Sequence, residues 1–435
     1  MLKLIKEKLH SGMGKDVVWT FTLQIVIMLC SFAINKLLSN RLSIDDFGQY
    51  NVIKRSVQVL SFVMLAGVGI ALPRYIPLYR NGEEKRRILP LLTASLVYIL
   101  GVTLVVVLLC IVFSGPMQHL IIGTTHPSPL TSHLYVIAIA YAFVLALAQY
   151  AYAYYRGIGD FKWYNGTQLG VQLAIILPLV LLPELTVQGV FTSWLIITLL
   201  LVAYYLGREL WHKRYALTSH LSPLTPHHSP LTSHLTTIAK YSSGRLVADF
   251  FLFSLSAFPL VYISNTQGLQ PTAYYSVGIT FVTMVTPVFS FMGIILLPYV
   301  SQAIAKNEVH SADRLVNRLA LLYVAASAVI TLLMYVFIRF LTLLFFAESY
   351  VAACDLSRIM ILSILPQALY LLYRNPIDAV SVVPYNTIIL AVCLVTMVVT
   401  FLLSTTITQL AWAYLAVSTL QGVLSYLTWQ FVRKR

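Results

Sequence analysis

Two adjacent cations, Lys54 and Arg55, lie inside an apolar segment that covers residues 50–72. At about 1.5 Å per residue, such a helix is long enough to cross a hydrocarbon core of roughly 30 Å. A cation in a membrane helix either extends to lipid phosphates or faces a polar interior. Neighbouring helical residues point in directions about 100° apart, so both cannot point comfortably into lipid. We therefore expect at least one of them to face inward, where it can hold an anion such as a diphosphate.

Six cations, these two included, lie toward the outer ends of predicted membrane spans. This placement runs against the usual preference of Lys and Arg for the cytoplasmic side. It predicts a cationic vestibule that meets an anionic substrate. For any single residue the alternative is that its side chain extends to outer-leaflet phosphates. The six residues are Lys36, Arg41, Lys54, Arg55, Arg339 and Arg358.

One acid lies deep in a predicted span. Asp249 stands four residues after Arg245, so the two can pair on one helix face. The carboxylate either binds H+ or Na+ and couples ion entry to movement, or it only neutralises Arg245. We favour the second interpretation, and no other cofactor is indicated.

Uncharged polar side chains recur in two predicted spans, with Gln24 and Asn35 in the first and Gln168 and Gln172 in the fifth. They can line the same cavity, although interhelical hydrogen bonding is the commoner use of such residues in membranes. A row of tyrosines near the inner end of the fourth span is expected to form an interfacial belt, with stacking on sugar rings as the alternative. The tyrosines are Tyr150, Tyr152, Tyr154 and Tyr155.

The composition is that of a polytopic membrane protein. Of the 435 residues, 59% are hydrophobic and 10% are charged, whereas soluble domains carry about 25% charged residues. The net charge of +14 arises from short loops between apolar segments and not from a stripe on one face, which argues against nucleic acid as a partner. The four cysteines are scattered, without the spacing of a zinc site or a disulfide framework.

No pattern predicts an enzyme. The chain has no Walker motif. The longest predicted outer loop, 115–133, ends in a short repeat. The unit S-P-L-T-S-H-L occurs at 128–134 and 229–235, with a variant at 222–228. Such units are expected in solvated loops, since they are rich in proline, serine and threonine. Metal binding by their histidines is the less favoured alternative, because the copies fall on opposite sides of the membrane.

Apolar runs bounded by polar residues, proline or glycine predict about twelve spans. The expected fold is all-α, with two pseudo-symmetric lobes of six helices. The lobes cover 1–207 and 238–435, joined by a cytoplasmic linker at 208–237. The predicted spans are 16–39, 50–73, 88–113, 134–155, 164–182, 187–207, 238–264, 273–299, 315–346, 355–374, 380–403 and 408–432.

An internal repeat supports two lobes, because it aligns Tyr50 with Tyr275 and Pro73 with Pro298. The second span of each lobe is therefore expected to begin after a tyrosine and to end at a proline. Parallel repeats of this kind place a substrate path between the lobes. Both termini are expected to be cytoplasmic, because 22 of the 29 Lys and Arg residues lie at the termini or in alternate loops.

Two motifs carry a resemblance to a known family. The first is L-S-x-x-x-F-G-x-Y at 42–50, followed by Gly67, Gly69, P-R-Y and a basic loop. The second is Y-R-G-I-G-D-F-K-W-Y at 155–164. Together they resemble the polysaccharide-export family, part of a superfamily that also holds multidrug exporters and lipid II flippases.

This resemblance implies that the chain flips an undecaprenyl-diphosphate-linked oligosaccharide to the outer leaflet of the bacterial inner membrane, for O-antigen, capsule or exopolysaccharide synthesis. It implies membrane lipids and other polysaccharide-assembly proteins as partners. The alternatives are a drug or small-molecule exporter, or a lipid II flippase, of the same superfamily. A non-transporting envelope enzyme or scaffold is the alternative of a different class.

Overall fold

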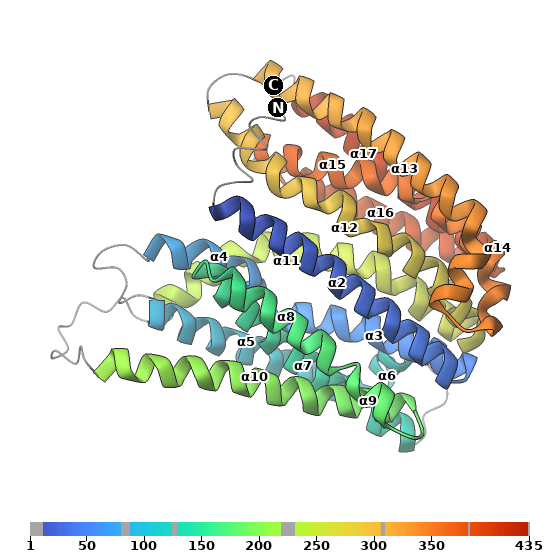
Figure 1. The fold of residues 1–435 in the computed structure, drawn as a ribbon, viewed down its shortest axis with the longest axis horizontal. Coiled ribbons are helices and arrows are strands. Elements are labelled where there is room, and N and C mark those ends of the chain that lie inside the picture. Colours follow the sequence, from blue (N-terminus) through green and yellow to red (C-terminus); the bar gives the residue numbers. More distant parts are fainter. Residues whose placement is uncertain are drawn as a thin grey trace. The chain divides into compact units, whose positions relative to one another are not determined.

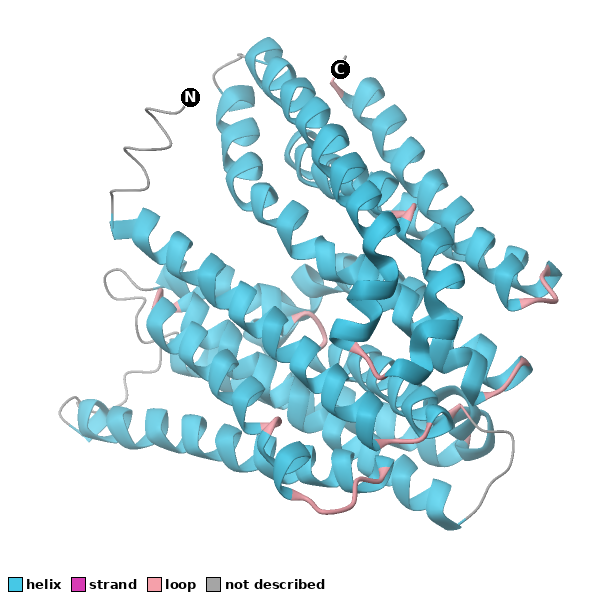
Figure 2. Ribbon diagram, turned by 45° about the vertical axis from the view of Figure 1, so that its right-hand side comes forward, coloured by secondary structure: helices cyan, strands magenta, loops and turns pink. Residues whose placement is uncertain are grey.

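The computed structural model describes residues 12–79, 88–123, 129–218, 231–305, 309–381 and 383–433. Within these residues all regular secondary structure is helical (Figure 2). Ten helices are long and apolar enough to cross a membrane, or up to twelve when each of two bent helix pairs counts as one span. The all-α fold and the expected number of spans are confirmed.

Each predicted span corresponds to one helix or to helices separated by a short break. The helices of the N-terminal half are α2 (Gly12–Arg41), α3 (Ile44–Leu65), α4 (Val68–Tyr79), α5 (Ile88–Val112), α6 (Ser114–Ile122), α7 (Pro129–Gly157), α8 (Phe161–Ala174), α9 (Leu177–Leu181) and α10 (Val187–Thr218). Those of the C-terminal half are α11 (Leu231–Thr266), α12 (Leu269–Ala305), α13 (Val309–Phe345), the 3-10 helix η2 (Glu348–Ala353), α14 (Cys354–Ile361), α15 (Ile364–Val380), α16 (Tyr385–Leu403) and α17 (Ile407–Val432).

The first compact unit comprises Met1–Ile34 and Ile53–Phe250. Its centre is α7, which packs against α4, α6, α8 and α10 (Figure 1). The buried face of α7 carries small residues such as Ala138, Ala142 and Ala146. Small side chains let neighbouring membrane helices approach closely, which explains why so many helices contact α7.

The second compact unit comprises Asn35–Val52 and Phe251–Arg435, so the end of α2 and the beginning of α3 belong with the C-terminal helices. Its centre is α15, which packs against α12, α13 and α17. Gly422 permits α17 to approach α15 closely, because a Cβ there would lie 2.6 Å from the carbonyl oxygen of Pro366.

The segment 208–237, which the sequence assigns to a linker, is helical at both ends. Helix α10 extends into it as far as Thr218, and α11 begins within it at Leu231. The residues between these helices lie outside the described part of the chain. The two compact units divide inside α11, at Phe250.

The prediction that two helices end at prolines is wrong. Helix α4 continues through Pro73 to Tyr79, and α12 continues through Pro298 to Ala305. A proline inside a helix removes one backbone hydrogen bond, and the helix can continue in a membrane when the freed carbonyl finds another donor. Near Pro73 this donor is Arg156, which belongs to the candidate site.

The repeat units were expected to be non-helical, and this is also wrong. Helix α7 begins at Pro129 and α11 begins at Leu231, so the described parts of two units, 129–134 and 231–235, form helix starts. Proline is favoured at the first position of a helix, because its missing N–H would have no intrahelical partner there. The variant at 222–228 lies outside the described residues.

Candidate functional site

The second span is broken near its middle, where α3 and α4 are bent by 40°. At the break Ala66 has a φ of 52° and Gly67 a φ of 75°, a conformation that is costly for alanine. Gly67 also lies close to α11, because a Cβ there would lie 2.6 Å from Cβ of Ser242. Broken helices in transporters supply substrate and ion sites. The α3–α4 break is therefore the starting point of the candidate site.

Arg156, at the end of α7, holds the half-helix that follows the break. Its Nη2 donates a hydrogen bond to the carbonyl oxygen of Gly69 at 3.0 Å. In a regular helix this carbonyl would accept from the N–H of residue 73, but Pro73 has no N–H. Arg156 supplies the missing donor and allows α4 to continue past its proline.

The other residues of the Y-R-G-I-G-D-F-K-W-Y motif hold the surrounding helices. A Cβ at Gly157 would lie 3.1 Å from the carbonyl oxygen of Leu72, so only glycine lets α7 approach α4 so closely. The Asp160 carboxylate accepts a hydrogen bond from the Trp163 N–H at 3.1 Å and caps α8. The Arg208 guanidinium of α10 lies 3.7 Å from the centre of the Trp163 ring. The motif thus joins α4, α7, α8 and α10.

We expect Arg156→Ala to lower the free energy of unfolding by about 1–2 kcal/mol, since it leaves the Gly69 carbonyl without its charged donor. Pro73→Ala restores a backbone N–H that can bond this carbonyl. In the Pro73→Ala background, Arg156→Ala should therefore cost less than half as much. The measurement is thermal unfolding of the purified variants in detergent. Lys162→Ala, which removes an exposed cation from α8, is the control, and equal costs in both backgrounds would contradict this account.

Lys54 and Arg55 lie on α3, before the break, in the first unit. Both side chains are half-buried, and Nη1 of Arg55 donates a long hydrogen bond of 3.4 Å to the amide oxygen of Gln58. The next residue, Ser56, donates to the carbonyl oxygen of Leu120 in α6 at 3.0 Å. The two cations therefore lie in partly enclosed surroundings beside a polar neighbour.

The other four cations of the expected vestibule belong to the second unit. Lys36 caps the end of α13, because its Nζ donates to the carbonyl oxygens of Leu343 at 2.7 Å and Phe346 at 2.6 Å. One turn later, the Ser39 hydroxyl accepts from the Ala347 N–H at 3.0 Å. The last carbonyls of a helix have no intrahelical donor, so Lys36 and Ser39 hold α2 against this helix end.

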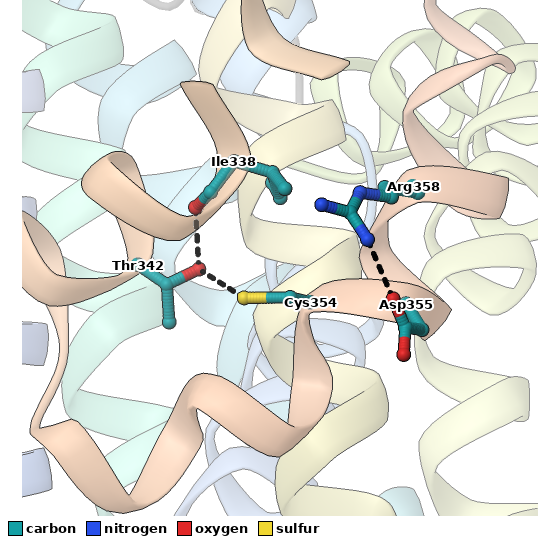
Figure 3. Close-up of polar contacts among 5 residues, drawn as sticks. All are labelled: Ile338, Thr342, Cys354, Asp355 and Arg358. Atoms are coloured by element: carbon teal, nitrogen blue, oxygen red, sulfur yellow. Dashed lines mark hydrogen bonds and ion pairs between the residues drawn. The ribbon is translucent and has the colours of Figure 1, made fainter. Parts of the chain in front are cut away.

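Arg358 also has a protein partner, which the sequence analysis overlooked. Its Nη1 donates to the Asp355 carboxylate at 2.6 Å (Figure 3), and its Cζ lies 5.8 Å from the centre of the Tyr335 ring. Arg339 is exposed and Arg41 is half-buried. The six cations are thus divided between the two units, and Lys36, Arg55 and Arg358 each donate hydrogen bonds to groups of the protein itself.

Helices α2 and α8 are joined by a row of three hydrogen bonds, here called the polar ladder. All six side chains lie in the first unit, and they recur about once per helical turn or every second turn. The sequence indicated the glutamines but not their partners, since pairing between helices far apart in the chain leaves no local pattern. The bonds run from Asn165 Nδ2 to Thr20 Oγ1 at 2.9 Å, from Gln24 Nε2 to Gln168 Oε1 at 3.2 Å, and from Gln172 Nε2 to Ser31 Oγ at 3.2 Å.

Asn35 is not part of this ladder, because it is buried and belongs to the second unit. The side chain of Arg245 lies outside the described residues, whereas Asp249 is half-exposed on α11. The pairing of Arg245 with Asp249, and any role of this carboxylate in ion coupling, therefore stay predictions.

The tyrosine row of α7 forms part of the core of the first unit. Tyr150, Tyr154 and Tyr155 are buried, and the Tyr150 hydroxyl donates to the carbonyl oxygen of Leu92 at 3.1 Å. The expectation of an interfacial belt is wrong for these three residues. Their inward direction follows from the position of α7 at the centre of the unit.

The sequence matches known proteins over most of its length. Residues 13–304 match the model of a family described as polysaccharide biosynthesis protein. Residues 246–420 match the MatE model. No curated relative matches the sequence.

Several solved structures of membrane transporters share the fold. A Vibrio cholerae MATE transporter, VcmN, is 15% identical, with a TM-score of 0.62 over 96% of each chain. The lipid II flippase MurJ in an inward closed conformation is 14% identical, with a TM-score of 0.68 over 96% of this chain and 88% of that one. A MOP superfamily transporter from Pyrococcus furiosus is 12% identical, with a TM-score of 0.61 over 97% and 93% of the two chains. At these identities the likeness establishes the fold.

Proposed function

The chain belongs to the polysaccharide biosynthesis protein family, and from this premise we propose that it flips a lipid-diphosphate-linked oligosaccharide across the cytoplasmic membrane. Lys54 and Arg55 bind the diphosphate during the transfer. The glycan passes through the protein, because a sugar cannot cross hydrocarbon without leaving its hydrogen bonds unmade.

The observation that carries this proposal is the half-buried cation pair of α3, placed before a break in the same span. Partly enclosed cations bind phosphate oxygens more strongly than fully hydrated ones, since screening by water is weaker. Lys36, Arg41, Arg339 and Arg358 stay part of the proposed cationic path. The α3 pair carries the test, because its two cations are adjacent in the chain and lie before the break of the same span.

A drug or small-molecule exporter with the same fold is the competing proposal. A cationic drug would need acids where this chain has Lys54 and Arg55, so the charge of α3 argues against it. A lipid II flippase would recognise the same diphosphate, and only the glycan would differ. Export of one lipid-linked glycan but not the other separates these two alternatives.

We expect Lys54→Ala and Arg55→Ala each to weaken substrate retention roughly 10- to 100-fold, because a hydrogen bond to a charged group is worth about 1.5–3 kcal/mol. Arg55→Lys should be milder than Arg55→Ala but not silent, because lysine lacks the bidentate fork. The measurement is the accumulation of lipid-linked oligosaccharide on the inner leaflet of cells at matched protein levels.

The control for this experiment is Arg318→Ala, which removes an exposed cation from the second unit. It changes the net charge as much as either single variant, and export should stay normal. Full export by the Lys54→Ala, Arg55→Ala double variant would contradict diphosphate binding by α3. The two side chains would then serve as lipid anchors.

A further inference from the structure

The polar ladder uses only part of the hydrogen-bonding capacity of its three glutamines. An amide side chain offers two N–H donors and an oxygen with two lone pairs. Among the described residues, Gln24 and Gln172 each donate one side-chain hydrogen bond and Gln168 accepts one. The carbonyl oxygens of Gln24 and Gln172, one N–H of each of these two residues, and the NH2 group of Gln168 are left over.

These three side chains are half-exposed, unlike the anchoring Asn165, which is only 1% exposed. They lie within two helical segments of the structure that are long and apolar enough to cross a membrane, Thr22–Arg41 and Phe161–Leu181. An amide group that faces hydrocarbon without a partner costs several kcal/mol. The exposed side of the ladder must therefore face water or a polar ligand, even though both helices cross the membrane.

The chemistry of the ladder selects an uncharged ligand. Its six side chains are amides and hydroxyls, and none carries a charge. Free acceptors at Gln24 and Gln172, together with the free donors of all three glutamines, match a chain of hydroxyl groups, since each hydroxyl both donates and accepts. A phosphate matches the ladder less well, because a fully ionised phosphate cannot donate to the free carbonyl oxygens of Gln24 and Gln172 and no side chain of the ladder offsets its charge.

We propose that Gln24, Gln168 and Gln172 form a track that hydrogen-bonds the glycan of the substrate, separate from the cations that hold its diphosphate. This inference rests on the proposed function. It divides recognition between charged side chains of α3 and neutral side chains of α2 and α8. The competing explanation is that the ladder only joins the two helices, which is a common use of such residues.

A matched pair of variants separates the two explanations. Gln172→Met and Ser31→Ala remove the same interhelical hydrogen bond, but only the first removes the amide. If the amide contacts sugar, Gln172→Met should weaken binding of a glycan-bearing lipid roughly 2- to 10-fold, the worth of one neutral hydrogen bond. Ser31→Ala should leave it unchanged. Gln24→Met, on the other helix, should repeat the loss if Gln172→Met is poorly folded.

The experiment measures equilibrium binding to the purified full chain in lipid nanodiscs with two probes. These are undecaprenyl diphosphate and undecaprenyl diphosphate linked to N-acetylglucosamine. We expect the wild type to bind the sugar-bearing probe more tightly, and Gln172→Met to lose part of this difference while it binds undecaprenyl diphosphate normally.

The outcomes distinguish this inference from the proposed function. Equal losses in Gln172→Met and Ser31→Ala would overturn the glycan track and leave the ladder as a helix contact. Equal affinity of the wild type for both probes would also overturn the track but keep the diphosphate site. Binding of neither probe would overturn the proposed function, and the track with it.

Discussion

Replacing Gly48 by valine is expected to remove nearly all folded protein from the membrane. Gly48 lies in the first turns of α3, where a Cβ would overlap the carbonyl oxygen of Leu269 and lie 2.9 Å from its carbonyl carbon. Both residues belong to the second unit. The obstacle is backbone at the start of α12, so no side-chain rotation relieves the overlap.

Overpacking of this kind commonly costs 1–3 kcal/mol and more when backbone must move, against a total stability of about 5–15 kcal/mol. The measurement is the amount of monodisperse protein extracted from membranes, by fluorescence-detected size exclusion. Gly101→Val on α5 is the control, because a Cβ at Gly101 would meet nothing within 4 Å. A normal yield of Gly48→Val would show that the α3 and α12 backbones do not approach this closely.

The same glycine shows what a motif can and cannot predict. The pattern around Gly48 indicated the family and the entry into the second span. It did not indicate the reason for a glycine at this position, which is a contact with Leu269 on a helix far along the chain. Tertiary contacts of this type leave no local trace.

The membrane spans were predictable because hydrophobic length is a local property of sequence. The breaks within spans were not predictable, as Pro73 shows. A proline predicts a helix end when its freed carbonyl has no donor, but here Arg156 supplies one from α7. The helix continues, and the break lies instead at Ala66 and Gly67, where nothing in the sequence marks alanine for a left-handed conformation.

The sequence indicated which residues are unusual enough to form a candidate site, but it did not indicate the groups that these residues contact. The sequence indicated Lys36 and Arg358 as unusual cations, and the structure gives one of them carbonyl acceptors and the other a carboxylate. It likewise indicated Gln24, Gln168 and Gln172 without their pairing. Charge and polarity are visible in a sequence, whereas the distance to a neutralising group depends on the fold.

Lys36→Met is expected to lower the free energy of unfolding by roughly 2–4 kcal/mol, because it removes two charged hydrogen bonds to carbonyl oxygens. The carbonyls of Leu343 and Phe346 lie at the end of α13, where the helix has no donors of its own and its dipole favours a cation. Methionine keeps the length and apolar stem of lysine, so the loss reports the ammonium group alone.

The measurement is thermal unfolding of purified Lys36→Met beside Lys36→Arg and Arg339→Met. Arginine retains donors that can reach a carbonyl, so Lys36→Arg should recover part of the loss. Arg339→Met removes an exposed cation from the same unit and should leave stability unchanged. Wild-type stability of Lys36→Met together with weaker binding of undecaprenyl diphosphate would contradict the capping role. Lys36 would then belong with Lys54 and Arg55 as a ligand of the substrate's diphosphate.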